Sequence, residues 1–303
     1  MQIRTTTTTR LSRRRLLGAA AALGGTALAG PLLGGCGGPS DPLSRLRAGG
    51  DVVVGLSGER PFGYTDGSGR ATGESPEVAR AVVTGLGGSG LAAVQTKFDQ
   101  LIPGLLDGRF DVIAVGLTIT ALRCQQVAFS RPDYVAGTGL VVPVGNPLGV
   151  ATLAGVRRSG ATLAVLDGSA EQEYALAAGI RAEHIVTVDS QGALVREVAN
   201  GGAQVGALTR ISLLDEVRRN AGIGLEVTAA FAPEVAGRTV LGAGAFAFRP
   251  ADGAFRDEFD RGLTALQESG RWLELAAPFG FTAANLPPRD LTVDELCTRT
   301  PDS

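Results

Sequence analysis

The sequence predicts an α/β protein of two lobes that are joined by two extended crossings. Short segments rich in Val, Ile and Leu alternate with amphipathic segments between residues 51 and 133, and the alternation begins again between residues 150 and 234. Two extended segments, residues 134–144 and 238–248, separate the alternating regions. We therefore expect lobe 1 to contain residues 51–140 and 240–303, and lobe 2 to contain residues 141–239.

Lobe 1 is expected to begin with an apolar strand at residues 51–56, followed by a loop, residues 58–64, at its carboxyl end. Ser75-Pro76-Glu77 predicts the start of a helix, because Ser is a favoured N-cap and Pro is favoured at the first helical position. That helix is expected to end near Leu86, among glycines, and a second strand is expected near residues 91–96.

Residues 98–130 carry a predicted helix, a buried strand and a second helix. Leu and Ile recur at helical spacing from Leu101 to Leu106, and Asp107-Gly108 is expected to end this first helix. Residues 112–115 form an apolar, β-branched run, which is typical of a strand covered on both faces.

A turn is expected at residues 116–119, directly after this strand, and Thr120 is the expected N-cap of the helix that carries Arg123. In open α/β sheets, ligands bind beyond the carboxyl ends of the strands. We therefore expect Phe98, Thr118 and Arg123 to surround one cleft.

Lobe 2 repeats the pattern, with strands expected at residues 162–166, 185–188 and 204–208, and helices at residues 171–178, 191–199 and 211–220. A turn that contains Gly168 and Ser169 precedes the first of these helices. Because the start of a helix presents free backbone N–H groups, this turn is a candidate contact for a carboxylate. After the second crossing, an amphipathic helix at residues 255–270 is expected in lobe 1.

The composition excludes several classes of function. The formal net charge is −2 and no basic run lies beyond the N-terminus, so nothing favours nucleic-acid binding. His184 is the single histidine, so neither a zinc site nor Ser-His-Asp chemistry is expected. No metal and no organic cofactor are implied.

The N-terminus resembles an export signal. Ser12-Arg13-Arg14-Arg15 resembles the twin-arginine export motif, and Leu33-Gly34-Gly35-Cys36 resembles a lipobox, in which the chain is cut before a lipidated cysteine. Residues 1–35 are therefore expected to be an export signal, and residues 36–50 the lipidated Cys36 and a tether. This predicts an extracytoplasmic protein that is lipid-anchored to the cell membrane. The alternative is a weakly hydrophobic transmembrane helix.

Two cysteines remain once Cys36 is lipidated, namely Cys124 and Cys297. In an oxidising compartment, two such cysteines are more often paired than free, so we expect a disulfide between them. Two buried thiols are the alternative.

Several motifs resemble one known family. Lobe 1 contains F-D-Q-L-I-P-G-L, G-R-F-D-V-I and T-I-T-A-L-R-C-Q-Q-V-A-F-S. This pattern resembles the solute-binding proteins of ABC importers that take up amino acids and related zwitterions, and the match runs from about Val52 to Phe281. Through G-E-R-P-F-G-Y and G-A-G-A-F-A-F-R, the chain is most similar to the ectoine and hydroxyectoine binders. The resemblance implies a periplasmic-binding-protein-like (type II) fold and a monomeric, non-enzymatic receptor that delivers its ligand to a membrane permease.

The resemblance also implies a ligand site. Arg123 would bind the carboxylate of the zwitterion, because a guanidinium matches a carboxylate with two parallel hydrogen bonds. Phe62 and Phe98 would sandwich a delocalised cationic ring, and Glu59 would pair with the cationic end. The alternatives are a surface arginine, aromatic side chains that pack under their loops, and a solvated glutamate.

Two threonines depart from the family patterns. Thr118 stands where ectoine binders carry a third aromatic side chain, and losing that wall weakens binding by about 1–2 kcal/mol. Thr209 stands where amino-acid binders usually carry the Asp that holds the α-ammonium group. An ectoine-like compatible solute is therefore the first expectation for the ligand, and a polar amino acid is the alternative.

Two other functions are alternatives to ligand delivery. Cyclohexadienyl dehydratases resemble these receptors, and Glu59 could serve such an enzyme as a general acid. A sensor that passes its ligand state to a membrane partner is the other alternative. We expect no enzymatic activity.

Overall fold

The computed structural model describes residues 41–235 and 237–298. The expected export signal, the expected lipidation site Cys36 and residues 37–40 of the expected tether lie outside these residues. Residues 42–47 of the expected tether form a helix whose Leu43 and Leu46 side chains are buried, so the folded part of the chain begins earlier than we predicted. Among the described residues, none of the helices has the length and hydrophobicity that a membrane span requires.

Lobe 1 is built on a mixed sheet with strand order β4-β1-β5-β15-β6, in which β7 also pairs with β15. β4, β1 and β5 are parallel, whereas β15 is antiparallel to β5. The strands of this lobe are β1 (Val52–Leu56), β2 (Tyr64–Thr65), β3 (Ala71–Thr72), β4 (Leu91–Gln95), β5 (Val112–Thr118), β6 (Ala128–Phe129), β7 (Tyr134–Val135) and β15 (Ala243–Phe248). Its helices are α1 (Pro42–Arg47), α2 (Glu74–Gly85), α3 (Leu101–Leu106), α4 (Ala121–Cys124), α9 (Gly253–Glu268), α10 (Arg271–Ala276) and α11 (Val293–Thr298).

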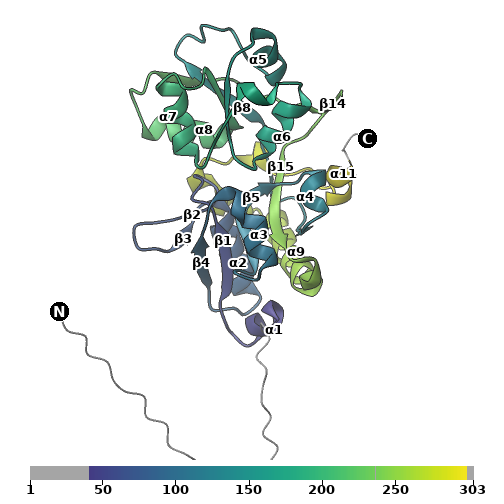
Figure 1. Ribbon diagram of the computed structural model, residues 1–303. Coiled ribbons are helices and arrows are strands. Elements are labelled where there is room, and N and C mark those ends of the chain that lie inside the picture. Colours follow the sequence, from purple (N-terminus) through teal and green to yellow (C-terminus); the bar gives the residue numbers. More distant parts are fainter. Residues whose placement is uncertain (1–40, 236, 299–303) are drawn as a thin grey trace, which may run out of the picture. The chain divides into compact units, whose positions relative to one another are not determined.

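Lobe 2 is built on a second sheet, with strand order β10-β9-β11-β8-β12, and it forms the upper part of Figure 1. Its strands are β8 (Thr138–Pro143), β9 (Leu163–Leu166), β10 (Ile185–Val188), β11 (Val205–Thr209) and β12 (Leu225–Val227). A two-stranded ribbon joins β13 (Glu234–Val235) to β14 (Arg238–Thr239). The helices are α5 (Leu153–Ser159), α6 (Ala170–Ala177), α7 (Gln191–Ala199) and α8 (Arg210–Arg219).

Two short connections join the lobes. The chain leaves the first sheet after β7 and enters the second at Thr138, the first residue of β8. It returns between the end of β14 and Ala243, the first residue of β15. The second sheet therefore begins before the boundary that we expected at residue 140. Two lobes that share only such connections are the usual setting for hinge closure around a ligand.

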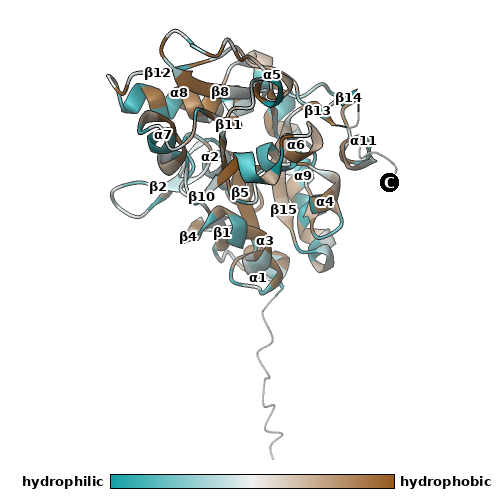
Figure 2. Cartoon of the chain, turned by 45° about the horizontal axis from the view of Figure 1, so that its top comes forward, coloured by the Kyte–Doolittle hydropathy of each residue, from teal (hydrophilic) through white to brown (hydrophobic). Residues whose placement is uncertain are grey.

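The two lobes bury different side chains. The core of lobe 1 is rich in aromatic residues, among them Phe246, Phe248, Phe255 and Phe259. The sheet of lobe 2 separates two clusters that are dominated by Val, Leu and Ala. Figure 2 shows the hydrophobic colouring along β5 and β15 inside lobe 1. Both cores follow from the alternating apolar strands and amphipathic helices that the sequence predicts.

Three helices of lobe 2 begin at a hydroxyl side chain. Thr152, Ser169 and Ser190 are the N-caps of α5, α6 and α7, and each side-chain oxygen accepts a hydrogen bond from a backbone N–H in the first turn. The elements β9, β10, β11, α6, α7 and α8 lie within two residues of the ranges that the sequence predicts, whereas α5 and β12 were not predicted.

The start of α2 differs from our prediction. The helix begins at Glu74, with Gly73 as its N-cap, so Ser75 lies inside the helix. The N–H groups of Glu74 and Ser75 donate to the carbonyl oxygens of Pro61 and Phe62, at 2.9 and 3.0 Å. Carbonyl oxygens of the loop after β1 thus accept hydrogen bonds from the first N–H groups of α2, which have no acceptor within the helix. These hydrogen bonds also hold the loop against α2.

The turn that we expected at residues 116–119 is also wrong. β5 continues to Thr118, because β15 pairs with it up to that residue. Gly116 has a positive φ of 62°, and the register of the pairing shifts between Ala245 and Ala247. The strand therefore bends at a bulge instead of ending, and Thr118 lies on the strand.

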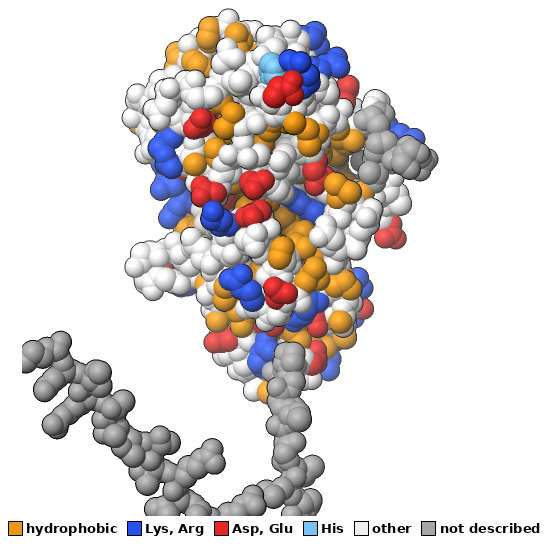
Figure 3. Space-filling view, in the orientation of Figure 1, with side chains coloured by type: hydrophobic (Ala, Val, Ile, Leu, Met, Phe, Trp, Pro, Cys, Tyr) orange, Lys and Arg blue, Asp and Glu red, His pale blue; other side chains and the backbone are white. Residues whose placement is uncertain are grey.

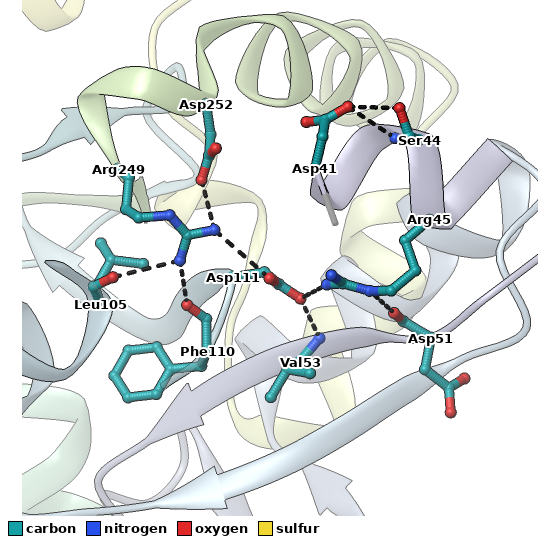
Figure 4. Close-up of polar contacts among 10 residues, drawn as sticks. All are labelled: Asp41, Ser44, Arg45, Asp51, Val53, Leu105, Phe110, Asp111, Arg249 and Asp252. Atoms are coloured by element: carbon teal, nitrogen blue, oxygen red, sulfur yellow. Dashed lines mark hydrogen bonds and ion pairs between the residues drawn. The ribbon is translucent and has the colours of Figure 1, made fainter. Parts of the chain in front are cut away.

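Polar contacts fasten the end of lobe 1 that lies away from the carboxyl ends of β1 and β5. Asp111, just before β5, forms ion pairs with Arg45 of α1 and with Arg249 after β15 (Figure 4). Arg249 also donates to the carbonyl oxygen of Phe110 and pairs with Asp252. One ionic cluster therefore connects helix α1, the residue before β5 and the residue after β15.

A disulfide between Cys124 and Cys297 links α4 to α11, and the two Cα atoms lie 5.8 Å apart. The bond spans 173 residues of sequence and attaches the C-terminal helix to the helix that follows β5. α11 consequently belongs to lobe 1.

Candidate functional site

A small cavity lies between the two lobes, at the carboxyl ends of β1, β5 and β11. Six of the eight ligand residues expected from the sequence line it, namely Glu59, Phe62, Phe98, Thr118, Ser169 and Thr209. The other two, Arg123 and Gly168, bond to each other beside it. Charged side chains of both signs gather on the surface at the level where the lobes meet (Figure 3), and Lys97 of lobe 1 pairs there with Asp189 of lobe 2.

Arg123 bridges the lobes. It is 4% exposed, and its guanidinium donates to the carbonyl oxygen of Thr118 in lobe 1 at 2.7 Å and to that of Gly168 in lobe 2 at 2.8 Å. The guanidinium carbon also lies 5.6 Å from the centre of the Phe98 ring. The side chain is therefore directed to the interface between the lobes, where a buried cation needs acceptors.

Glu59 is the acidic counterpart from lobe 1. Its carboxylate is buried and accepts a hydrogen bond from the Ser212 hydroxyl of α8 at 2.8 Å, so this contact also crosses between the lobes. Burial raises the pKa of Glu59 to about 7, and the negative charge of Glu171 adds to the rise, while Ser212 and Arg123 oppose it. Ser212 was not predicted, because nothing in the sequence places α8 against the loop after β1.

Glu171 is a second buried acid that we did not predict as a site residue. It lies in the first turn of α6, and the hydroxyls of Thr138 and Thr209 lie 3.4 and 3.5 Å from its Oε1 atom. Burial raises the pKa of Glu171, and the charge of Arg123 is among the effects that oppose the rise. The sequence feature that could have indicated Glu171 is its position directly after the predicted Gly168 turn. An acid is also common at that position for another reason, because it interacts favourably with the helix dipole.

Aromatic side chains form one wall of the cavity. The Phe62 ring lies 4.8 Å from that of Tyr134 and 5.3 Å from that of Phe281, and Phe62 is buried. Tyr134, which we did not predict, donates its hydroxyl to the carbonyl oxygen of Gly116 at 2.7 Å. A Cβ atom at Gly116 would lie 2.5 Å from the Phe62 ring, so only glycine leaves room for it. Phe62 thus packs under its loop and faces the cavity as well.

Two buried carboxyl groups lie behind this wall. Trp272 donates its indole N–H to Asp133 at 2.8 Å, and Asp133 is the residue before Tyr134. Burial raises the pKa of Asp133 to about 7, while the hydrogen bond from Trp272 opposes the rise. The Glu74 carboxyl, which accepts from the Ser75 hydroxyl at 2.8 Å, has its pKa raised by burial and by the charge of Asp133. Burial therefore favours the protonated form of both carboxyl groups.

The turn before α6 uses its N–H groups differently from our prediction. Gly168 donates its N–H to the Gln172 side chain at 2.8 Å, and Ser169 donates its N–H to the carbonyl oxygen of Leu166 at 3.0 Å. The turn presents the carbonyl oxygen of Gly168 to Arg123 instead.

The volume of the cavity is about 10 Å³, which is room for roughly one water molecule. Contacts between the lobes, from Arg123 to Gly168 and from Ser212 to Glu59, close it. A larger molecule therefore enters only when the lobes separate. Within the described residues, no group of His, Cys, Asp and Glu side chains could hold a metal ion.

One buried cation, two buried acids and an aromatic wall in a cleft between two hinged lobes define a receptor for a small polar molecule. The family model of the bacterial extracellular solute-binding proteins, family 3, matches residues 52–282. The chain belongs to this family, which confirms the resemblance to the solute-binding proteins of ABC importers.

Individual relatives agree with this assignment. A probable amino-acid ABC transporter periplasmic-binding protein of Sinorhizobium fredii is 30% identical over 261 residues, which are 84% of this chain and 86% of the relative. The crystal structure of EhuB in complex with hydroxyectoine is similar with a TM-score of 0.77 at 29% identity, over 86% of this chain and 99% of that chain. The fold is the type II periplasmic-binding-protein fold. A cyclohexadienyl dehydratase of Pseudomonas aeruginosa is 26% identical over 164 residues, 54% of this chain and 60% of the enzyme.

Proposed function

We propose that this protein is a lipid-anchored receptor that captures a small zwitterion between its lobes and delivers it to the membrane permease of an ABC importer. The observation that carries the proposal is the joint burial of Arg123, Glu59 and Glu171 around one interlobe cleft. A guanidinium and two carboxyl groups match the two ends of a zwitterion, and each of these buried groups gains a partner when the ligand binds.

Closure follows from the position of these groups. Lobe 1 supplies Arg123, Glu59 and the aromatic residues, whereas lobe 2 supplies Glu171 and the carbonyl oxygen of Gly168. A ligand that contacts both sets binds the closed form more tightly than the open form, and so shifts the hinge equilibrium toward closure. The permease then recognises the closed form.

An ectoine-type solute is the first candidate for the ligand. The similarity to EhuB with hydroxyectoine supports it, as do Phe62 and Phe98 on the walls of the cavity. A cationic ring against an aromatic face gains up to about 2 kcal/mol where water is excluded. Thr118, which replaces the third aromatic side chain, weakens this candidate.

A polar amino acid is the second candidate, and Glu171 favours it. The hydroxyl of Thr209 lies 3.5 Å from the carboxylate of Glu171, so an acid lies next to the position where Thr209 replaces the usual Asp. Glu171 would therefore supply the charge for an α-ammonium group. The Sinorhizobium fredii relative, a probable amino-acid binder, supports this candidate as well.

Isothermal titration calorimetry on the processed protein tests the proposal, with ectoine, hydroxyectoine and the twenty amino acids as ligands. We expect at least one of these zwitterions to bind, and we expect neutral sugars, as controls, not to bind. Failure of every zwitterion to bind would overturn the proposal. Conversion of prephenate or arogenate to an aromatic product would support the dehydratase alternative instead, with Glu59 as the general acid.

The anchor is tested separately by metabolic labelling with a radioactive fatty acid in a host that processes lipoproteins. We expect the label to be incorporated by the natural chain and to be absent from the Cys36→Ala variant. Equal labelling of the two chains would contradict lipidation of Cys36.

A further inference from the structure

Glu74 and Asp133 are two acids that the candidate ligand site does not use. Glu74 is the first residue of α2, Asp133 directly precedes β7, and both residues are fully buried in lobe 1. Neither residue lines the cavity between the lobes. Burial of an ionised carboxylate without a partner is strongly unfavourable, so the position of these acids requires a compensating group.

Each of the two carboxyl groups has one oxygen with a neutral donor and one without. Glu74 Oε2 accepts from the Ser75 hydroxyl, and Asp133 Oδ1 accepts from the Trp272 indole N–H, both at 2.8 Å. The other two oxygens, Glu74 Oε1 and Asp133 Oδ2, are buried and accept from no donor among the described residues. The two carboxyl groups hydrogen-bond to each other. Because ionised carboxylates only accept hydrogen bonds, this contact requires a proton, and one proton between the two groups satisfies both remaining oxygens.

No cation takes the place of that proton, because neither acid forms an ion pair among the described residues. Arg131, two residues before Asp133, instead donates to the Thr264 hydroxyl at 2.6 Å. The charge of both acids acts on Tyr134, but burial raises the pKa of Tyr134 well above its usual value, so its hydroxyl stays neutral. The arginines of the surrounding helices α2, α9 and α10 pair with other acids: Arg80 with Glu77, Arg256 with Asp257, Arg261 with Glu258 and Arg271 with Glu274.

The pair of acids joins the two segments that carry the aromatic wall of the candidate site. The first two backbone N–H groups of α2, which begins at Glu74, donate to the loop that carries Phe62. Asp133 directly precedes Tyr134, whose ring lies 4.8 Å from that of Phe62, and the first crossing to lobe 2 follows β7. The hydrogen bond between the acids therefore fastens the Phe62 loop to the strand that continues into the crossing.

We propose that Glu74 and Asp133 form a buried proton site, in which one shared proton at neutral to mildly alkaline pH holds together the two segments of the aromatic wall. The ligand of this site is the proton itself, which exchanges with water. Loss of the proton places two negative charges next to each other in the core of lobe 1 and destabilises that lobe. The proposal goes beyond ligand capture and is independent of it, because the folded chain takes up the proton whether or not a zwitterion binds.

The proton site makes the stability of the protein depend on pH in a defined direction. Burial raises the pKa of Glu74, and it raises that of Asp133 to about 7, so the folded chain binds more protons than the unfolded chain above the ordinary pKa of about 4. The stabilisation is therefore complete below about pH 4 and is lost as the pH rises through the pKa values of the folded chain. For each proton taken up on folding, the folding equilibrium constant falls by up to about tenfold per pH unit.

Glu74→Gln tests the site, because the amide N–H replaces the proton as the donor to Asp133 and does not titrate. Urea denaturation without ligand, between pH 5.5 and 8.5, measures the folding equilibrium constants of the natural chain and the variant. We expect the ratio of the variant's constant to that of the natural chain to rise with pH, by up to about tenfold per unit. Groups that both chains share, such as Glu59, cancel in this ratio. A ratio that stays constant across the series would overturn the proposal.

Asp133→Asn is the second variant, and we expect its ratio to rise with pH in the same direction, since its amide donates to Glu74. The matched control is Glu77→Gln, because Glu77 lies about one turn along the same helix and pairs with Arg80. We expect the ratio for this control to be the same at every pH. A rise as steep in the control as in Glu74→Gln would contradict the assignment to the buried pair.

Infrared spectroscopy of the natural chain at pH 8 detects the proton directly, even where a variant fails to fold. We expect the absorption band of a protonated carboxyl group in the natural chain, and a loss of intensity in Glu74→Gln. A natural chain without this band, or a variant that retains all of it, would overturn the proposal.

Discussion

Lobe 1 and lobe 2 contribute to the cleft in different ways. Lobe 1 supplies aromatic rings and Arg123, and the Phe62 ring packs against Tyr134 and Phe281. Lobe 2 supplies a carbonyl oxygen, hydroxyls and Glu171 from the starts of its helices. We propose that lobe 1 is the platform on which the ligand rests, and that lobe 2 adds polar partners on closure. Selectivity for shape then resides mainly in lobe 1, and the energy of closure mainly in contacts that reach lobe 2.

Arg123→Ala is expected to have the largest effect, because Arg123 belongs to the platform and also bonds to lobe 2. It would remove the partner of the ligand carboxylate, so we expect a loss of about 2–4 kcal/mol in binding free energy. Calorimetry with the candidate zwitterion that binds most tightly to the natural chain measures it, and Arg158→Ala, an exposed arginine of α5, is the control. Unchanged affinity would remove Arg123 from the site.

Replacing Cys124 and Cys297 by Ser tests how far the platform depends on its covalent link. The bond closes a long loop, so its loss should lower the free energy of unfolding by about 2–4 kcal/mol. Urea denaturation of the natural chain and the double variant measures the difference. An unchanged unfolding midpoint would show that packing alone holds α11 on lobe 1.

The pH dependence of binding tests the contribution of Glu59, the acid that lobe 1 supplies to the cleft. Burial raises the pKa of Glu59 to about 7, so below pH 7 this carboxyl must release a proton before it can pair with a cation. Affinity for a cationic ligand should therefore fall as the pH decreases from 8 to 5.5, by at most about tenfold per unit below pH 7.

Glu59→Gln is the matched variant for this pH series. It should bind more weakly at pH 8 and show a flatter profile, since the amide does not titrate. A profile that is equally steep in the variant would assign the pH dependence to another group, such as Glu171.

Ser212→Ala is expected to have the smallest effect. It removes the single hydrogen bond from α8 to Glu59 and should weaken ligand binding by about 1 kcal/mol. Small-angle X-ray scattering with saturating ligand shows whether closure still occurs. If the variant lost binding entirely, lobe 2 would contribute more than polar partners, and the contrast between the lobes would need revision.

The sequence predicts the helices and strands correctly where their own hydrophobic pattern determines their bounds. Strand β10 and helix α7 have the bounds that the sequence predicts. The prediction failed where tertiary contacts decide: loop carbonyl oxygens cap α2 in place of Ser75, and pairing with β15 extends β5 through Thr118. Backbone groups that are remote in sequence produced both differences.

The candidate site could be predicted at the ends of strands but not across the gap between the lobes. Glu59, Phe98 and Thr118 follow or end strands, where ligands of such sheets bind. Glu171, Tyr134 and Ser212 reach the site because one lobe folds over the other or because a crossing strand passes behind it. No local pattern carries that information for Tyr134 and Ser212, whereas Glu171 directly follows the turn that contains Gly168.

The contact between Trp272 and Asp133 makes the protein its own optical reporter. Trp272 is the single tryptophan of the chain, and it is fully buried. Its indole hydrogen-bonds to the acid that precedes Tyr134, directly behind the aromatic wall. Emission excited at the red edge of the absorption band, where the three tyrosines absorb little, therefore comes from one fluorophore in one layer of lobe 1. Movement of that wall, or a change in the charge of Asp133, should shift the emission without any attached dye.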